Sequence, residues 1–173
     1  MKRSRGFTLA EMMIVLIIIG TISGLITVSV ARTRIKARDA RRAADIGQII
    51  TAIELYYQDY KTYPASGYWS GLPNANWLNS NNPGWDTLAT QLAPYISPLP
   101  KDPLNTPTGW PGLASPPSYS YAYSSSGGGC ALQWYEIVYR PEGANPGSPG
   151  VTLCTGAIEN YAGTVTMGNN ARQ

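Results

Sequence analysis

The feature that most constrains this chain is a run of consecutive uncharged, mainly apolar residues at positions 12–31. In an α-helix a run of this length extends about 30 Å, which is the thickness of the hydrocarbon core of a bilayer. Basic residues flank the run on both sides, so the positive-inside rule does not by itself set an orientation. A secretory signal peptide has a shorter apolar stretch and a small-residue cleavage site after it, which is missing here. The run therefore predicts a membrane-spanning helix.

The helical pattern continues beyond the apolar run. Apolar residues recur there every three or four positions, as on one face of an α-helix: Ile46, Ile49, Ile50, Ile53, Tyr57 and Tyr60. The polar residues between them are expected on the other faces: Asp45, Gln48, Glu54 and Gln58. No proline precedes Pro64, which disfavours helical backbone at Tyr63. We therefore expect one helix from about Phe7 to about Tyr60.

The segment that follows has a different composition, because all 14 prolines lie at or after position 64. One short helix is expected at residues 85–92, between stretches of loop. Strand-like runs rich in β-branched and aromatic residues follow, at 119–123, 132–139, 151–155, 157–161 and 163–167. The expected fold is therefore α+β, with a long N-terminal helix packed on a small antiparallel β-sheet head. The apolar face of residues 46–60 would cover the sheet.

Charge is distributed unevenly along the chain. Of its 13 Lys and Arg residues, nine lie at or before Arg42, whereas the part from Ala43 onward has 4 basic and 8 acidic residues. The head is therefore acidic, and a nucleic-acid partner is not expected. The chain has no histidine, which is the commonest general base and the commonest metal ligand. No group of residues suggests catalysis, so we do not expect an enzyme.

The decisive motif precedes the apolar run and reads Arg5-Gly6-Phe7-Thr8-Leu9-Ala10-Glu11. A basic leader, a Gly before a Phe, and a Glu four residues later resemble the class III signal of type IV pilins and type II secretion pseudopilins. In that family prepilin peptidase cleaves after the Gly and methylates the new N-terminus. The resemblance implies cleavage between Gly6 and Phe7 and an N-methylated Phe7. Gly6 suits this role because it has no side chain to hinder the peptide bond.

The resemblance also implies how the chain is organised and what it binds. Residues 1–6 would be a cleaved leader, 7–31 a transmembrane and filament-core helix, 32–62 its amphipathic continuation, and 63–173 the globular head. The expected partners are identical subunits in a helical filament, prepilin peptidase, a membrane assembly platform, and the membrane itself before assembly. The precursor would cross the cytoplasmic membrane once, with its head outside the cytoplasm. It would then join an extracellular or periplasm-spanning filament.

Glu11 is the residue expected to control assembly. An ionised carboxylate at the start of an apolar helix is costly unless it is paired. Its partner would be the cationic amine of Phe7 in a neighbouring subunit, and this pairing would set the axial register of the filament. Taken alone, Glu11 would be an ordinary acidic residue at a helix N-terminus. The complete motif favours the assembly role.

A second resemblance covers residues 59–64 and 99–105, which are similar to the helix-to-head junction and the following loop of pseudopilins and many bacterial pilins. In pseudopilins that region can bind calcium, and Asp102 and Asn105 are the residues concerned here. The Trp-Gly pair usual after Asp-Pro is replaced by Leu104 and Asn105. An Asp-Pro pair is also a common turn opener. We therefore expect no cofactor, and calcium is the alternative.

The two cysteines, Cys130 and Cys154, are expected to form one disulfide, because the head would be exported to an oxidising compartment. Two thiols without histidine would make only half of a zinc site. Three functions remain open for the subunit. The first is a structural subunit of a type IV pilus, the second a pseudopilin of a type II secretion system, and the third a minor or DNA-uptake pilin. The altered Asp-Pro loop favours the first over the second.

Overall fold

The structure of the chain is a computed structural model, which describes residues 6–67, 77–107, 109–112 and 117–170, apart from the side chains of residues 24–29. The chain divides into two compact units, Met1–Ala37 and Arg38–Gln173. The boundary between the units falls inside one helix. The domain boundaries predicted from the sequence stay predictions.

The helix α1 extends over Leu9–Tyr60, a length of 52 residues. The prediction of one long helix between about Phe7 and about Tyr60 is therefore confirmed. Beyond its last residue, Lys61 has a positive φ of 58°, and its backbone N–H donates to the carbonyl oxygen of Tyr57 at 2.8 Å. A left-handed residue at this position ends the helix, and Pro64 prevents its continuation.

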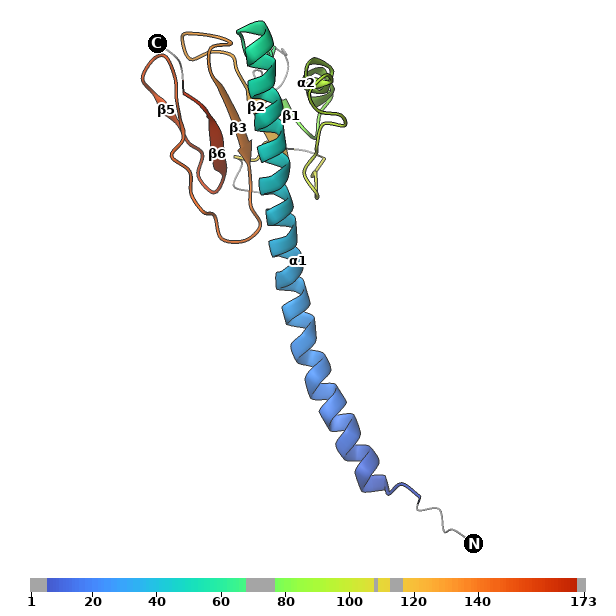
Figure 1. The fold of residues 1–173 in the computed structure, drawn as a ribbon. Helices are drawn as coiled ribbons and strands as arrows, with labels where there is room; N and C mark the ends of the chain where they lie inside the picture. Colours follow the sequence, from blue (N-terminus) through green and yellow to red (C-terminus); the bar gives the residue numbers. More distant parts are fainter. Residues whose placement is uncertain (1–5, 68–76, 108, 113–116, 171–173) are drawn as a thin grey trace. The chain divides into compact units, whose positions relative to one another are not determined.

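The head contains two antiparallel sheets (Figure 1). The larger has four strands in the order β1-β2-β3-β6, namely β1 Leu78–Asn79, β2 Tyr121–Ser124, β3 Tyr135–Tyr139 and β6 Val165–Asn169. The smaller pairs β4 Val151–Thr152 with β5 Ile158–Glu159. The predicted α+β class is confirmed, although the runs predicted at 151–155 and 157–161 form a sheet of their own.

The core of the head lies between α1 and the four-stranded sheet. Ile46, Ile49 and Ile53 of α1 have no exposed surface, as their spacing predicts. Within the head, Figure 1 shows this part of α1 beside β2 and β3, with the short helix α2 (Gly84–Leu92) on the other side of α1 from β6. The helix α2 agrees with the prediction at 85–92, and it adds three fully buried side chains to the same core: Trp85, Leu88 and Leu92.

The central strand β3 is buried on both of its faces. Tyr135, Ile137 and Tyr139 belong to the core against α1, whereas Glu136 and Val138 point to the opposite face. All five residues of the strand are nevertheless buried. The sheet is therefore covered on both sides, which the alternation of residues in an antiparallel strand does not by itself require.

Two residues of α1 differ from the prediction. Tyr60 is expected on the buried face but is 59% exposed, because it is the last residue of the helix and its ring contacts Tyr56 at a centroid distance of 4.4 Å. Asp45 is expected on another face but is only 9% exposed, and its Oδ2 accepts a hydrogen bond from the hydroxyl of Tyr121 at 3.0 Å. A polar residue is tolerated in such a position where a hydrogen bond satisfies it.

The edge strand β1 has no counterpart in the prediction. It is 2 residues long and lies in an Asn-rich stretch that reads as loop. Its pairing with β2 continues at Ser80, whose backbone N–H donates to the carbonyl oxygen of Tyr121 at 2.8 Å. A strand this short carries no periodic pattern, so only its partner strand defines it.

Candidate processing and assembly site

The junction between Gly6 and Phe7 lies before the first residue of α1, Leu9. Both residues of the junction are exposed, and Phe7 retains 77% of its accessible surface. No atom lies within 4 Å of the position that a Cβ would take at Gly6. The peptide bond is therefore sterically open within the described part of the chain. Residues 1–5 of the predicted leader lie outside the described residues.

Thr8 and Glu11 cap the start of α1. The Oε2 atom of Glu11 accepts hydrogen bonds from the backbone N–H and the hydroxyl of Thr8, at 2.8 and 2.9 Å. In return, the hydroxyl oxygen of Thr8 accepts a hydrogen bond from the backbone N–H of Glu11 at 3.3 Å. This capping box satisfies N–H groups that the first turn of a helix leaves unpaired. The prediction missed it, although the spacing Thr-x-x-Glu before an apolar run was a usable signal.

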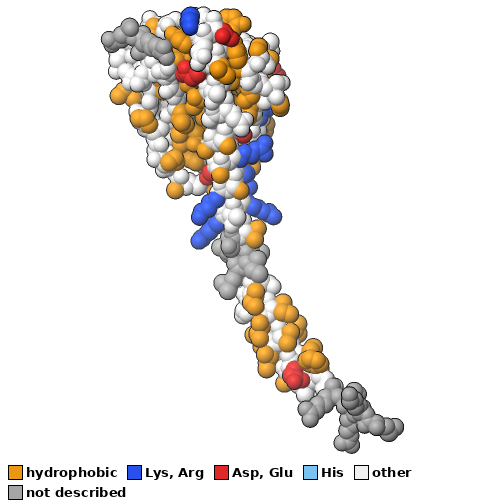
Figure 2. All heavy atoms as spheres, in the orientation of Figure 1, with side chains coloured by type: hydrophobic (Ala, Val, Ile, Leu, Met, Phe, Trp, Pro, Cys, Tyr) orange, Lys and Arg blue, Asp and Glu red, His pale blue; other side chains and the backbone are white. Residues whose placement is uncertain are grey.

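The first turns of α1 expose many apolar side chains, and Figure 2 shows them along the face in view. The exposed large side chains are Phe7, just before α1, and within these turns Leu9, Met12, Met13, Ile14, Val15, Leu16, Ile17, Ile18, Ile19 and Ile22. Consecutive helical residues point about 100° apart, so this run covers the whole circumference. A helix that is apolar all round is normally buried in a membrane or in an assembly.

The predicted membrane segment at 12–31 includes residues 24–29, whose side chains lie outside the described part of the structure. A search of the described residues finds no helix with the length and apolarity needed to cross a membrane.

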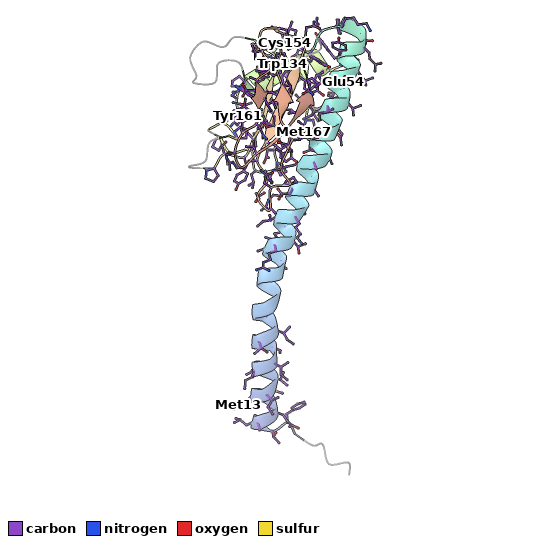
Figure 3. All side chains as sticks on the ribbon, turned by 90° about the vertical axis from the view of Figure 1, so that its left-hand side faces the viewer. Met13, Glu54, Trp134, Cys154, Tyr161 and Met167 are labelled. Atoms are coloured by element: carbon purple, nitrogen blue, oxygen red, sulfur yellow. A yellow bond between two sulfur atoms is a disulfide. The ribbon has the colours of Figure 1, made fainter. Side chains whose placement is uncertain are left out.

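Cys130 and Cys154 form a disulfide, with their Cα atoms 5.9 Å apart. The bond joins the turn that follows β2 to the segment that follows β4, across a sequence separation of 24 residues. Cys154 lies at the same end of the head as Trp134 (Figure 3), whose indole N–H donates to the carbonyl oxygen of Gly127 at 3.2 Å. Closing a loop of this size stabilises a head by about 3 kcal/mol, chiefly by restricting the unfolded chain.

Asp102 of the predicted calcium loop is paired with an arginine. Its two carboxylate oxygens accept hydrogen bonds from Nε and Nη2 of Arg42, at 2.7 and 3.0 Å. Its Oδ1 also accepts the backbone N–H of Leu104 at 2.8 Å, as a turn opener does. The backbone N–H of Asn105 also donates to this Oδ1, at 3.3 Å, whereas the side-chain Oδ1 of Asn105 accepts the hydroxyl of Ser80 at 2.7 Å. Among the described residues no three acidic, Cys or His side chains gather as a metal site, and calcium at this loop stays untested.

Arg42 is the centre of a buried ion-pair network that the prediction missed. Its side chain has no exposed surface, and its Nη1 donates to Asp39 and to Glu142, each at 2.7 Å. Glu142 also accepts two hydrogen bonds from Arg38, at 2.7 and 2.6 Å. The network joins α1 to the loop at Asp102 and to the loop after β3. A usable signal was the position of Arg42, four residues before Ile46 on the buried face of the helix.

The network also determines how its members titrate. Burial by itself would lower the pKa of Arg42, but its hydrogen bonds with Asp102 and Glu142 raise that pKa above its ordinary value. The hydrogen bond from Arg38 holds the pKa of Glu142 below its usual range. Burial opposes ionisation of Asp39, yet the backbone N–H groups of Glu142 and Gly143 lower its pKa. Arg42, Glu142 and Asp39 are therefore charged near neutral pH, and the network holds α1 to the two loops.

Comparison with known proteins connects the N-terminal segment to a family. The family model described as the prokaryotic N-terminal methylation motif matches residues 1–27. A protein of Vibrio cholerae serotype O1, named type II secretion system core protein G, is 30% identical over 103 residues, which are 60% of this chain and 67% of that relative. The chain belongs to the type IV pilin and type II secretion pseudopilin family.

Two further relatives of this pilin-like chain carry the same name. The core protein G of Aeromonas hydrophila is 28% identical over 106 residues, covering 61% of this chain and 71% of the relative. That of Escherichia coli strain K12 is 33% identical over 64 residues, covering 37% of this chain and 44% of the relative. No solved structure matches the chain. The segment matched by the methylation motif contains the exposed Gly6–Phe7 junction and the Thr8–Glu11 cap of the pilin-like chain.

Proposed function

We propose that this chain is a non-enzymatic structural subunit of a helical filament, polymerised through its N-terminal helix. The observation that carries the proposal is the apolar surface of the first turns of α1, with Ile17 at 62% and Leu16 at 68% exposure. Such a surface needs cover from a membrane before assembly and from neighbouring helices after it. The chain would be held in the cytoplasmic membrane by this segment, with its head outside the cytoplasm.

Processing would precede assembly. Prepilin peptidase would cleave between Gly6 and Phe7 and methylate the amine of Phe7, and a membrane assembly platform would then add the subunit to the filament. Support comes from the matched methylation motif and from the exposed junction before α1. Removal of residues 1–6 deletes three basic side chains, which leaves 10 basic and 10 acidic residues in the mature chain.

Two classes of filament suit such a subunit. The names of the relatives favour a pseudopilus of a type II secretion system, since each is a core protein G. The alternative is a type IV pilus, a reading that the altered Asp-Pro loop favours, because Leu104 and Asn105 replace the usual Trp-Gly pair. Filament length and location, measured by immunogold labelling of intact cells and of cells with a permeabilised envelope, would separate the two.

The assembly role of Glu11 follows from the energetics of a buried charge. In the isolated subunit its carboxylate is satisfied by Thr8. In a filament the amine of Phe7 from a neighbour would be enclosed by apolar helices, and Glu11 would be its counter-ion. Removing one partner of a buried ion pair costs roughly 3–5 kcal/mol, because the other charge stays uncompensated.

We therefore expect Glu11→Ala to be processed and inserted normally but to form few or no filaments. Thr8→Val is the matched control, since it removes the capping hydroxyl and leaves the carboxylate. Glu11→Gln preserves shape and hydrogen bonding but not charge, so it should also be defective. The measurements are the intact mass of the membrane-extracted protein and electron microscopy of sheared filaments.

The outcomes distinguish processing from assembly. A mature chain that begins anywhere but Phe7 would contradict the cleavage site. Normal filaments built only from Glu11→Ala subunits would contradict the ion-pair role of Glu11. A defect of equal size in Thr8→Val would assign the effect of Glu11 to helix capping instead.

A further inference from the structure

Three basic residues follow the apolar run of α1 directly, namely Arg32, Arg34 and Lys36, and together they are called the basic collar. All three side chains are exposed. Within the described residues, none of the ion pairs involves a member of the collar. The collar therefore carries three positive charges for which the described part of the chain supplies no carboxylate.

The next basic residues of the helix behave differently. Arg38 pairs with Glu142, Arg42 is buried among carboxylates, and Arg41 lies 3.6 Å from Asp45. Along the helix, Lys36 is thus the last basic residue without an ion pair among the described residues, and Arg38, two positions later, is the first with one. Folding of the head therefore accounts for the later cations, whereas the collar has no carboxylate partner among the described residues.

The positions of the collar residues around the helix indicate what kind of partner they suit. Arg32 and Lys36 are four residues apart and project from one side, whereas Arg34 lies about 200° away on the opposite side. A protein groove contacts one face of a helix. Lipid headgroups surround a membrane helix on all sides, and so match a collar that points both ways.

The depth of the collar fits the same partner. Arg32 is the first residue after the apolar run, and Lys36 is about 6 Å further along the helix axis at 1.5 Å per residue. The headgroup layer of each leaflet is about 5–8 Å thick, being the difference between the whole bilayer and its hydrocarbon core. Long Arg and Lys side chains also extend toward the interface from such positions.

We propose that the basic collar binds the phosphate groups of anionic phospholipids at the extracytoplasmic surface of the membrane. The inference rests on the proposed function, because it requires residues 12–31 to be the membrane segment. Anionic lipid then holds the unassembled subunit at a fixed depth. A subunit that enters the filament must exchange these lipid contacts for others, so anionic lipid opposes its extraction.

The test uses the full chain in phosphatidylcholine vesicles, with a fluorophore on Ala37→Cys, an exposed position next to the collar. The native cysteines are joined in the disulfide and stay unlabelled. Quenching is measured with phosphatidylglycerol or phosphatidylcholine that carries a nitroxide near its headgroup. We expect the labelled phosphatidylglycerol to quench the fluorophore with an apparent affinity at least about fivefold higher than that of the labelled phosphatidylcholine. This factor corresponds to one basic residue near an anionic surface. The quotient of the two affinities is called the quenching ratio. High salt should reduce the ratio.

The variants separate the collar from general charge effects. The triple change R32Q/R34Q/K36Q should bring the quenching ratio close to one, and the charge-conserving R32K/R34K/K36R should retain it. The matched control K2Q/R3Q/R5Q removes three basic residues from the other flank of the apolar run, and should also retain it. A ratio near one in the unmodified chain, or an unchanged ratio in R32Q/R34Q/K36Q, would overturn the proposal.

Two other outcomes have distinct meanings. If the chain fails to float with phosphatidylcholine vesicles after carbonate extraction, the membrane segment itself is wrong, and the proposed function fails with the collar proposal. If R32Q/R34Q/K36Q keeps the lipid ratio but loses filaments, the collar binds a neighbouring subunit, and the lipid proposal is overturned.

Discussion

Glu136 places a carboxyl group in the interior of the head, on the face of β3 that points away from α1. The residue is 2% exposed, and its Oε2 has no hydrogen-bond partner among the described residues. The hydroxyl of Tyr161 donates to its Oε1 at 3.3 Å. Burial, aided by the charge of Glu159, raises the pKa of Glu136 to about 8, although the hydrogen bond from Tyr161 lowers it in part. The side chain is therefore mostly protonated at neutral pH.

This raised pKa makes the stability of the head depend on pH. The folded state holds the proton of Glu136 up to about pH 8, whereas the unfolded chain releases it near its ordinary value of 4.5. The contribution is thus fully present below about pH 4.5 and is lost as the pH rises through about 8. Between pH 5 and pH 8 the free energy of unfolding should fall by about 3 kcal/mol because of Glu136, and Glu136→Gln should abolish this fall.

Urea unfolding of the detergent-solubilised chain across this pH range is the measurement. Asp86→Asn is a suitable control, since that side chain is 74% exposed and pairs with Lys101 only at 3.6 Å. The explanation is wrong if Glu136→Gln and the unmodified chain have parallel profiles of unfolding free energy against pH.

At the scale of single elements, α1 combines two kinds of buried face. The apolar face at Ile46, Ile49 and Ile53 follows the ordinary helical period, which is why it was predictable. The turn before it buries Arg42 and Asp45, and these were not predicted, because charged residues are ordinarily read as solvent-facing. Their burial depends on partners from distant loops, such as Asp102, which a local pattern does not contain.

The strands show the same limit. The run at 132–139 contains β3, so the existence of that strand could be read from its aromatic and β-branched residues. Burial of Glu136 on the second face could not, since it depends on covering segments far along the chain, including Tyr161. The candidate processing site could be proposed from the sequence because its motif is contiguous, whereas the capping role of Thr8 was missed in the same stretch.

The buried network on α1 leads to a stability prediction. Arg42→Ala should lower the free energy of unfolding by roughly 3–5 kcal/mol, because Asp102 and its neighbours would keep buried, unpaired charges. Arg41→Ala is the matched control on the adjacent residue. Its side chain is 67% exposed with one contact to Asp45 at 3.6 Å, so the change should cost less than about 1 kcal/mol. Equal losses in urea unfolding for the two variants would contradict the structural role of Arg42.

At the scale of the whole molecule, the residues from Arg38 onward form one compact unit that includes the second part of α1. That part supplies Ile46, Ile49 and Ile53 to the core, and Arg42 to the ion-pair network. The head is therefore larger than the stretch after the helix, and its fold requires helical residues that precede Tyr60.

A shortened chain that begins at Arg32 should accordingly fold, remain monomeric and form the Cys130–Cys154 bond. A chain that begins at residue 54 lacks the three isoleucines and Arg42, and should not unfold cooperatively. Circular dichroism during thermal unfolding and mass spectrometry under non-reducing conditions would measure both. A cooperative transition in the shorter chain would show that the helical residues are dispensable for the head.

The burial of Ile46, Ile49 and Ile53 in the head also bears on how filament subunits can exchange parts during evolution or in the laboratory. Recombination at Tyr60, the last residue of α1, would join the helical core residues of one subunit to the sheet of another. The two parts of the core would then not fit each other. A crossover before Arg38 transfers the complete unit with its own helical segment. Heads of different sequence are thus expected to be inherited together with the second half of their helix, while the apolar first half can be shared.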